Sequence, residues 1–211
     1  MCPMTRTGNS APISRRTKGR TPSVDVERSI VDAAESLLEA EGADALTVRR
    51  IATAAGVAPM GVYNHLGGKQ GVLDALLMRG FDGLTAALAG VASDDPFEDL
   101  AEAGRRYRDF ARAHPSHYAL MFERSISDYE PSALALDRAA ESFKALEALV
   151  DRAMASGAIL TADVTEVAQA LWSTVHGSAS LELHGMGFCE NLVVTQEATS
   201  DALLRGLRSA D

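Results

Sequence analysis

Two short helical patterns separated by one glycine constrain the fold of this chain more than any other feature of its sequence. Residues 47–76 read TVRRIATAAGVAPMGVYNHLGGKQGVLDAL. The spacing predicts a helix over 48–55, a left-handed turn at Gly56 and a second helix over about 58–65. Neither segment is long enough to be stable in isolation, so both must pack on a neighbour. The apolar pattern at 22–41 supplies that neighbour, and the three segments together predict a helix-turn-helix unit.

The rest of the chain also favours helices. It has 211 residues, a hydrophobic content of 46% and no alternating pattern of the kind that predicts strands. We therefore expect an all-α protein of about nine helices. The six further helices are expected at about 70–91, 96–113, 116–124, 131–156, 163–185 and 194–208. The expected organisation is a disordered basic tail (1–20), a helix-turn-helix DNA-binding domain (21–68), a connecting helix (69–91) and a larger effector-binding and dimerisation domain (92–211).

The charge of the chain is unevenly distributed. The net charge is −9, but residues 1–80 hold 10 Lys and Arg against 8 Asp and Glu, whereas residues 81–211 hold 10 against 21. Residues 1–20 carry five basic side chains and no acidic one. A basic front on an acidic body favours local contact with a polyanion, and a merely solvated tail is the alternative.

A helix-turn-helix unit places its second short helix in the major groove of DNA, while the first crosses the backbone. This role accounts for the polar residues of 58–65, which a core helix would not need. The alternative is a three-helix core with solvated polar residues. The residues expected to contact DNA are Thr47, Arg49, Arg50, Pro59, Met60, Gly61, Tyr63, Asn64, His65 and Lys69. Among them, Asn64 is able to pair with adenine, and Gly61 lets the backbone come close.

The same stretch resembles the signature of the TetR family of transcriptional regulators. The matching residues are Leu46, Thr47, Ile51, Ala52, Ala55, Gly56, Val57, Gly61, Tyr63, His65, Lys69 and Leu73. The resemblance covers about residues 24–85. Leu66 departs from it, since the family usually has phenylalanine there. In the late helix, Trp172, His176 and Gly177 resemble the Trp-x-x-x-His-Gly element of one class of C-terminal domain in this family.

The resemblance implies a homodimer that binds double-stranded, palindromic operator DNA and responds to a small effector. The expected function is repression, with release from the operator by a small apolar or aromatic molecule. A DNA-binding regulator without an effector is the alternative, and a helical enzyme or metal-binding protein is a distant one. The basic tail resembles N-terminal extensions that reach a minor groove in some members, through Arg15, Arg16, Lys18 and Arg20.

Two further sets of residues in the C-terminal region are candidates for the effector pocket and for the dimer interface. An effector pocket needs a largely apolar cavity with a few polar groups. Its candidates are Tyr107, Phe110, Tyr118, Met121, Phe122, Phe143, Trp172 and His176. The family's usual dimer interface joins the last two helices of each protomer, and two apolar stripes there match it. The stripes are Val164, Val167, Ala168, Leu171 and Val175, and Ala198, Ala202 and Leu203. For both sets, simple packing in the protomer's own core is the alternative.

Other classes of function find little support in the sequence. It contains no nucleophile elbow, phosphate-binding loop or HExxH motif, so we expect no enzyme activity and no cofactor. His114 and His117 form the one histidine pair close in sequence, but Pro115 between them argues against a regular helical metal site, and we expect none. The N-terminus lacks an apolar signal segment, and no apolar run reaches the ~18 residues of a membrane span, so we expect a cytoplasmic protein without membrane contact.

Overall fold

The computed structural model describes residues 23–123, 126 and 128–208. Helices joined by turns and loops make up this part of the chain, with one isolated bridge between Ile159 and Arg208. The helices are α1 (Ser23–Glu41), the 3-10 turn η1 (Ala43–Ala45), α2 (Val48–Ala54), α3 (Pro59–Leu66), α4 (Lys69–Leu88), α5 (Pro96–Ala113), α6 (Pro115–Phe122), α7 (Ala133–Ala155), α8 (Val164–Leu183) and α9 (Leu192–Leu207). The expected all-α class is confirmed.

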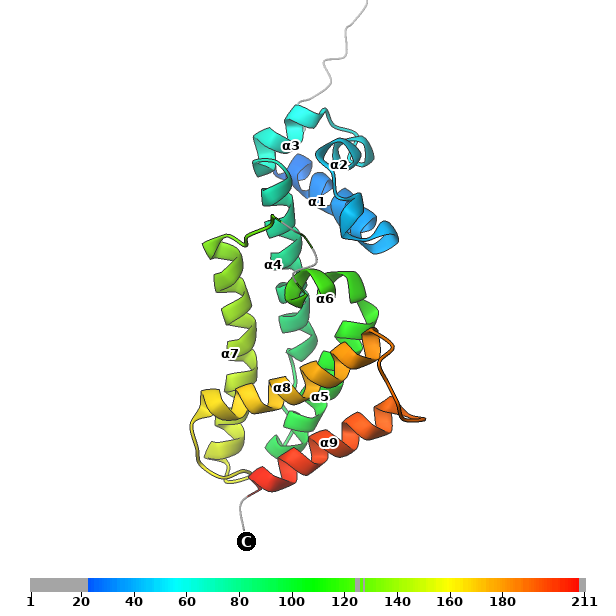
Figure 1. Ribbon diagram of the computed structural model, residues 1–211. Helices are drawn as coiled ribbons and strands as arrows, with labels where there is room; N and C mark the ends of the chain where they lie inside the picture. Colours follow the sequence, from blue (N-terminus) through cyan, green and yellow to red (C-terminus); the bar gives the residue numbers. More distant parts are fainter. Residues whose placement is uncertain (1–22, 124–125, 127, 209–211) are drawn as a thin grey trace, which may run out of the picture.

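Helices α1 to α3 form a small head at one end of the elongated molecule, and α4 runs from the head into the body (Figure 1). The head buries the apolar stripe of α1, including Ile30, Ala34 and Leu38, against Ile51 of α2 and Val62 of α3. Two short helices thus share one core with two longer ones. This packing supplies the stability that short helices lack in isolation.

The body consists of α5 to α9 packed around the lower part of α4. Helices α7 and α4 lie side by side, while α8 and α9 cross the far end of the body (Figure 1). The end of α9 contacts the α7–α8 connection, where the Leu160 amide donates to the Leu207 carbonyl over 2.7 Å. The body therefore has its own core, which includes Leu100, Val150 and Leu204.

Helix α4 is the main link between head and body, and polar contacts reinforce it. Arg79 on α4 donates to both Asp32 and Glu35 on α1. Asp74, one turn nearer the head, accepts from the Tyr129 hydroxyl over 2.8 Å. Arg79 therefore ties α4 to the head, and Asp74 ties it to the segment before α7 in the body.

The helix boundaries agree with the expected ones to within a few residues. The largest difference is at the end of α4, which stops at Leu88 because Ala89 is extended and Gly90 takes a left-handed φ of 75°. Helix α9 begins two residues early because Asn191 caps it, accepting from the Val194 amide. No helix in the described part of the chain combines the length and apolarity that crossing a bilayer requires.

Candidate functional site

The turn between α2 and α3 is built from local signals. Thr47 caps α2 by accepting from the Arg50 amide over 3.3 Å. Gly56 has a φ of 67°, which other residues rarely adopt, and the Val57 amide then donates to the Ala52 carbonyl. Pro59 occupies the first turn of α3, where its missing amide proton costs nothing. The result is a short, rigid connection between the two helices.

Helix α3 presents one polar face to solvent and one apolar residue to the core. Val62 is fully buried, whereas Met60 is 64% exposed and Tyr63 53% exposed. Asn64 is exposed as well. A Cβ added at Gly61 would meet Val57 at an ordinary 3.5 Å, so contacts within the chain do not require glycine there. The outward face of α3 is thus free to meet a partner closely.

Three glycines after α3 allow a tight junction with α4, and the Tyr63 ring lies against one of them. Gly67 and Gly68 have φ values of 71° and 102°. A Cβ on Gly68 would lie 2.9 Å from Cε1 of Tyr63, and one on Gly71 would clash with the Leu66 carbonyl. The GG-x-x-G sequence therefore brings the start of α4 tightly against the end of α3, with the tyrosine ring lying over the turn.

The basic and hydroxyl side chains around α3 differ in their availability. Arg49 is exposed, but Arg50 forms an ion pair with Glu41. Lys69 is half-buried, and so is His65, whose Nδ1 lies 3.1 Å from the Ser23 hydroxyl. The tail residues Arg15, Arg16, Lys18 and Arg20 lie outside the described residues.

Ser23 is a contact that the sequence analysis missed. It stands at the first residue of α1 and meets His65, forty-two residues away. A serine beside a helix start is a common capping signal, and nothing in the sequence separates that role from a long-range contact. The contact joins the start of α1 to the end of α3.

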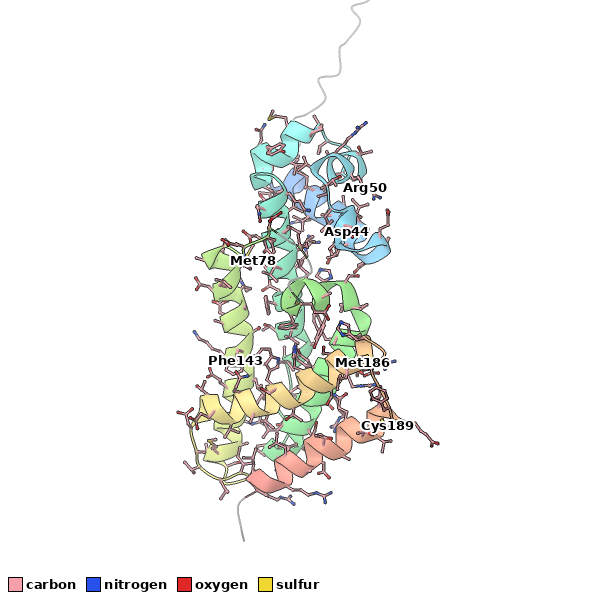
Figure 2. The ribbon with its side chains drawn as sticks, viewed as in Figure 1. Asp44, Arg50, Met78, Phe143, Met186 and Cys189 are labelled. Atoms are coloured by element: carbon pink, nitrogen blue, oxygen red, sulfur yellow. The ribbon has the colours of Figure 1, made fainter. Side chains whose placement is uncertain are left out.

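Six of the eight predicted pocket residues form one aromatic cluster in the body. The ring contacts join the following residues: Tyr107, Tyr118, Phe122, Phe143, Trp172 and His176. Figure 2 places Phe143 within the body, far from Arg50 in the head. Phe110 packs beside this cluster against His114, and Met121 packs against Gly80. The eight residues are therefore close together, as a packed core.

Polar atoms inside the cluster satisfy one another. Nδ1 of His176 lies 2.8 Å from the Tyr107 hydroxyl and 2.9 Å from the Tyr118 hydroxyl. Trp172 donates its Nε1 proton to the Tyr107 hydroxyl over 3.3 Å. Burial raises the pKa of Tyr107 to about 12 and also raises that of Tyr118, while it lowers the pKa of His176. At neutral pH the histidine is therefore uncharged and its Nδ1 is able to accept.

A cavity of about 690 Å³ lies between α5, α8 and α9 rather than inside the aromatic cluster. Of the predicted pocket residues, Tyr107 and Trp172 line it. The other six do not line it: Phe110, Tyr118, Met121, Phe122, Phe143 and His176. The apolar part of its wall comes from Phe97, Ala101, Leu146, Leu171, Val175, Val193, Val194, Ala198, Leu203 and Leu204. The sequence did not indicate that α9 forms part of the cavity wall, because the amphipathic pattern of a helix does not specify which neighbouring element its apolar face contacts.

The predicted dimer stripe on α8 packs within the protomer. Val167, Ala168 and Val175 are buried in the protomer's own core, and Val164 and Leu171 pack partly against it. These five side chains therefore stabilise the body, which is the alternative that the sequence left open. On α9, Ala198 and Ala202 are exposed, Leu203 is half-buried, and Ala198 and Leu203 both line the cavity. The outward face of α8 carries Ala170, Ser173 and Leu181 instead.

Models of two known domain families match the chain. A model described as bacterial regulatory proteins, tetR family, matches residues 30–76, which include all of α2 and α3. A second, described as a tetracyclin repressor-like C-terminal domain, matches residues 100–207. The two matches correspond to the head with the first part of α4 and to most of the body.

Individual relatives agree with these matches. An uncharacterised HTH-type transcriptional regulator of Mycobacterium tuberculosis is 30% identical over 162 residues, which are 75% of this chain and 70% of that protein. The solved structure of a protein of unknown function from Rhodococcus sp. RHA1 has a TM-score of 0.78 and 29% identity, covering 92% of this chain and all of that one. AibR, solved with isovaleryl coenzyme A and operator DNA, has a TM-score of 0.59 at 22% identity, covering 87% and 98% of the two chains.

Proposed function

We propose, for a chain that belongs to the TetR family of DNA-binding transcriptional regulators, the role of a repressor that a small, largely apolar effector releases from a palindromic operator. The membership rests on the matched models and on the Mycobacterium tuberculosis relative, which is matched over 70% of its length. The observation that carries the DNA-binding part is the outward face of α3. It exposes Met60, Tyr63 and Asn64, while Val62 anchors the helix to the core.

In the proposed complex, α3 enters the major groove and α2 lies across the phosphates. Asn64 and Met60 meet base edges, and the Tyr63 hydroxyl, Thr47 and Lys69 bind phosphate oxygens. Gly61 allows the backbone of α3 to approach the DNA closely. Contacts within the chain do not require glycine at this position, which is consistent with that role. Arg50 contributes less than Arg49, because its ion pair with Glu41 must open first.

The effector site in this proposal is the cavity between α5, α8 and α9. Its volume falls in the range of small-molecule sites, and its wall is mainly apolar. The arginines at its rim already have acidic partners: Arg105 pairs with Glu98 and Glu102, and Arg108 pairs with Glu182. Such a wall favours an effector whose buried part is uncharged. AibR, which shares this fold, is known with an acyl-coenzyme A thioester, so that class is the first to test.

The proposed dimer uses the outward faces of α8 and α9. Small or apolar residues recur there at helical spacing on α8, at Ala170, Ser173, Gly177 and Leu181. A Cβ at Gly177 would meet nothing within 4 Å, so the surface there is open. Small side chains allow two helices to approach closely. In this dimer the effector cavity lies directly beneath the interface helices.

The proposed mechanism is a shift between two populations of the dimer. Two heads fit one face of the duplex only when their α3 helices lie about 34–36 Å apart. An effector that binds better to a protomer with another head position moves the dimer away from DNA. Helix α4 is the element placed to transmit that change, because it packs on α5 in the body and on α1 and α3 in the head.

A binding titration tests the proposal. The DNA upstream of the chain's own gene is labelled, and its anisotropy is followed at several salt concentrations. We expect log affinity to fall linearly with log salt, as phosphate contacts require. Adding acyl-coenzyme A thioesters or apolar aromatic compounds should then weaken binding in parallel with a rise in melting temperature. DNA binding that no compound alters would favour a regulator without an effector, and absence of DNA binding would contradict the proposal.

A further inference from the structure

His117 is a buried histidine without hydrogen-bond partners in the described structure. Its side chain is on α6 and only 4% of the residue is exposed. Neither Nδ1 nor Nε2 forms a hydrogen bond, although Nε2 lies 3.2 Å from Glu35 Oε1 without hydrogen-bond alignment. A buried polar group of this kind costs roughly 1–3 kcal/mol unless something satisfies it. A structural histidine in a core normally has a partner, so this one calls for an explanation.

Two further metal-ligating side chains converge on the same place. One ligand atom each from Glu39, His114 and His117 lies within 4.8 Å of the other two. Glu39 comes from the end of α1, and His114 is the residue shared by the end of α5 and the start of α6. Glu39 and His114 are exposed, so an ion can reach the group from solvent. The three residues therefore surround a point between the head and the α5–α6 corner.

We propose that Glu39, His114 and His117 form a binding site for a divalent transition-metal ion of the zinc class. Two imidazoles and a carboxylate are a ligand set that zinc favours, with water as a fourth ligand. Ligand atoms around a tetrahedral zinc lie roughly 3.3 Å apart, given Zn–N and Zn–O bonds of about 2.0–2.2 Å. The present ligand atoms lie within 4.8 Å of one another, so the two exposed side chains would have to rotate inward to reach that geometry.

The surroundings of His117 suit a metal ligand. The ring is buried, and an imidazole binds a metal in its neutral form. Glu35 is held by Arg79 and lies beside Nε2, where a carboxylate is able to orient a ligating imidazole.

This proposal departs from the expectation drawn from sequence, which was that His114 and His117 form no metal site. That expectation allowed for a distant carboxylate without identifying it, and it rested on Pro115, which interrupts the helical spacing of the two histidines. Glu39 is seventy-five residues away from His114, and the packing of α1 against α6 brings it to the pair. A bound ion would fasten the head to the corner of the body, on the side of α1 that faces α6.

The test uses the full-length protein without DNA, so its result is independent of the proposed repressor function. Zinc binding is measured by competition with a chromophoric chelator, and cobalt substitution reports the ligands by visible absorption. We expect one zinc per chain and a rise in melting temperature. His114→Ala and Glu39→Ala, both at exposed positions, should each weaken zinc binding at least tenfold and abolish that rise. His184→Ala removes an exposed histidine elsewhere and should change neither quantity.

Other results would overturn the site. Zinc that binds His114→Ala and Glu39→Ala as tightly as it binds the unaltered protein would show that these side chains are not ligands. A cobalt spectrum with a thiolate charge-transfer band would assign the ion to a cysteine such as the exposed Cys189. A failure to bind one equivalent of zinc would exclude the site outright.

Discussion

At the scale of single residues, Tyr63 links the fold of the head to its proposed contact with DNA. Its ring lies over the backbone at Gly68, where no other side chain fits without strain. Half of the residue remains exposed beside Met60 and Asn64. Glycine at position 68 thus leaves the space that the Tyr63 ring occupies, and so helps to fix the direction of this exposed side chain.

Substitution of Tyr63 tests this role. We expect Tyr63→Ala to weaken operator binding about tenfold or more, since a hydrogen bond to a charged phosphate contributes roughly 1.5–3 kcal/mol. Tyr63→Phe keeps the ring over Gly68 and should weaken binding similarly if the hydroxyl makes the contact. Anisotropy titrations give the affinities, and melting curves verify the fold. Full affinity in both variants would remove Tyr63 from the interface.

The tight junction between α3 and α4 leads to a prediction about stability. Gly71→Ala places a methyl group against the Leu66 carbonyl, so the backbone must shift, and we expect a loss of more than about 2 kcal/mol in unfolding free energy. Gly206→Ala is the matched control, because a Cβ there meets nothing within 4 Å. The control should be neutral or slightly stabilising. Urea denaturation measures both, and equal stabilities would contradict the described junction.

His176 makes stability depend on pH. Burial lowers its pKa in the folded state, while Glu123 opposes the shift, and the unfolded value is about 6.5. Below that pH the unfolded chain binds a proton that the folded chain resists, so the unfolding free energy should fall as pH decreases from about 6.5. His117 has a lowered pKa as well and adds to the effect. Urea denaturation between pH 7.5 and 5 should show a smaller loss for His176→Gln than for the unaltered protein.

At the scale of elements, α8 shows how one helix serves two surfaces. Its inward stripe, with Val167, Ala168 and Val175, fills the protomer's core. Its outward face carries small residues that a second protomer can approach. Both stripes have helical spacing. The more apolar stripe faces inward, because its burial in the protomer's own core stabilises the body.

A charge on the outward face of α8 tests the proposed dimer. Ala170→Glu should produce monomers in sedimentation, because a carboxylate would be buried between two copies without a partner. Ala140→Glu makes the same change at an exposed position of α7 and should leave the dimer intact. A dimer that survives Ala170→Glu would place the interface on another face.

At the scale of the whole molecule, the head and the body are joined by a continuous helix and by side-chain contacts on both sides of it. Arg79 connects α4 to α1, and Asp74 connects α4 to the segment before α7. The cavity lies between α5, α8 and α9, and α8 and α9 cross the end of the body away from the head (Figure 1). An effector there would therefore act on the head through rigid-body movement of helices rather than through direct contact.

Filling the cavity should separate effector binding from DNA binding. Gly104 lines the cavity, and a Cβ there meets nothing within 4 Å, so Gly104→Leu starts a side chain in open space beside the cavity. We expect the variant to bind DNA normally but to lose the response to an effector, by at least tenfold in its apparent affinity. Gly206→Leu is the control outside the cavity. An unchanged response in Gly104→Leu would locate the effector elsewhere.

The sequence by itself determined the helical class, the order of the helices and the exposed face of α3. These depend on local signals, such as the Thr47 cap, the left-handed Gly56 and the burial of Val62, which lie within a few residues of the structure they specify. Only the tertiary structure decided which stripe of α8 faces inward and where the cavity lies. It also decided that Glu39 meets His114 and His117. The physical reason is that these features depend on contacts between helices far apart in sequence, and helical periodicity records only that a face is apolar, not which surface covers it.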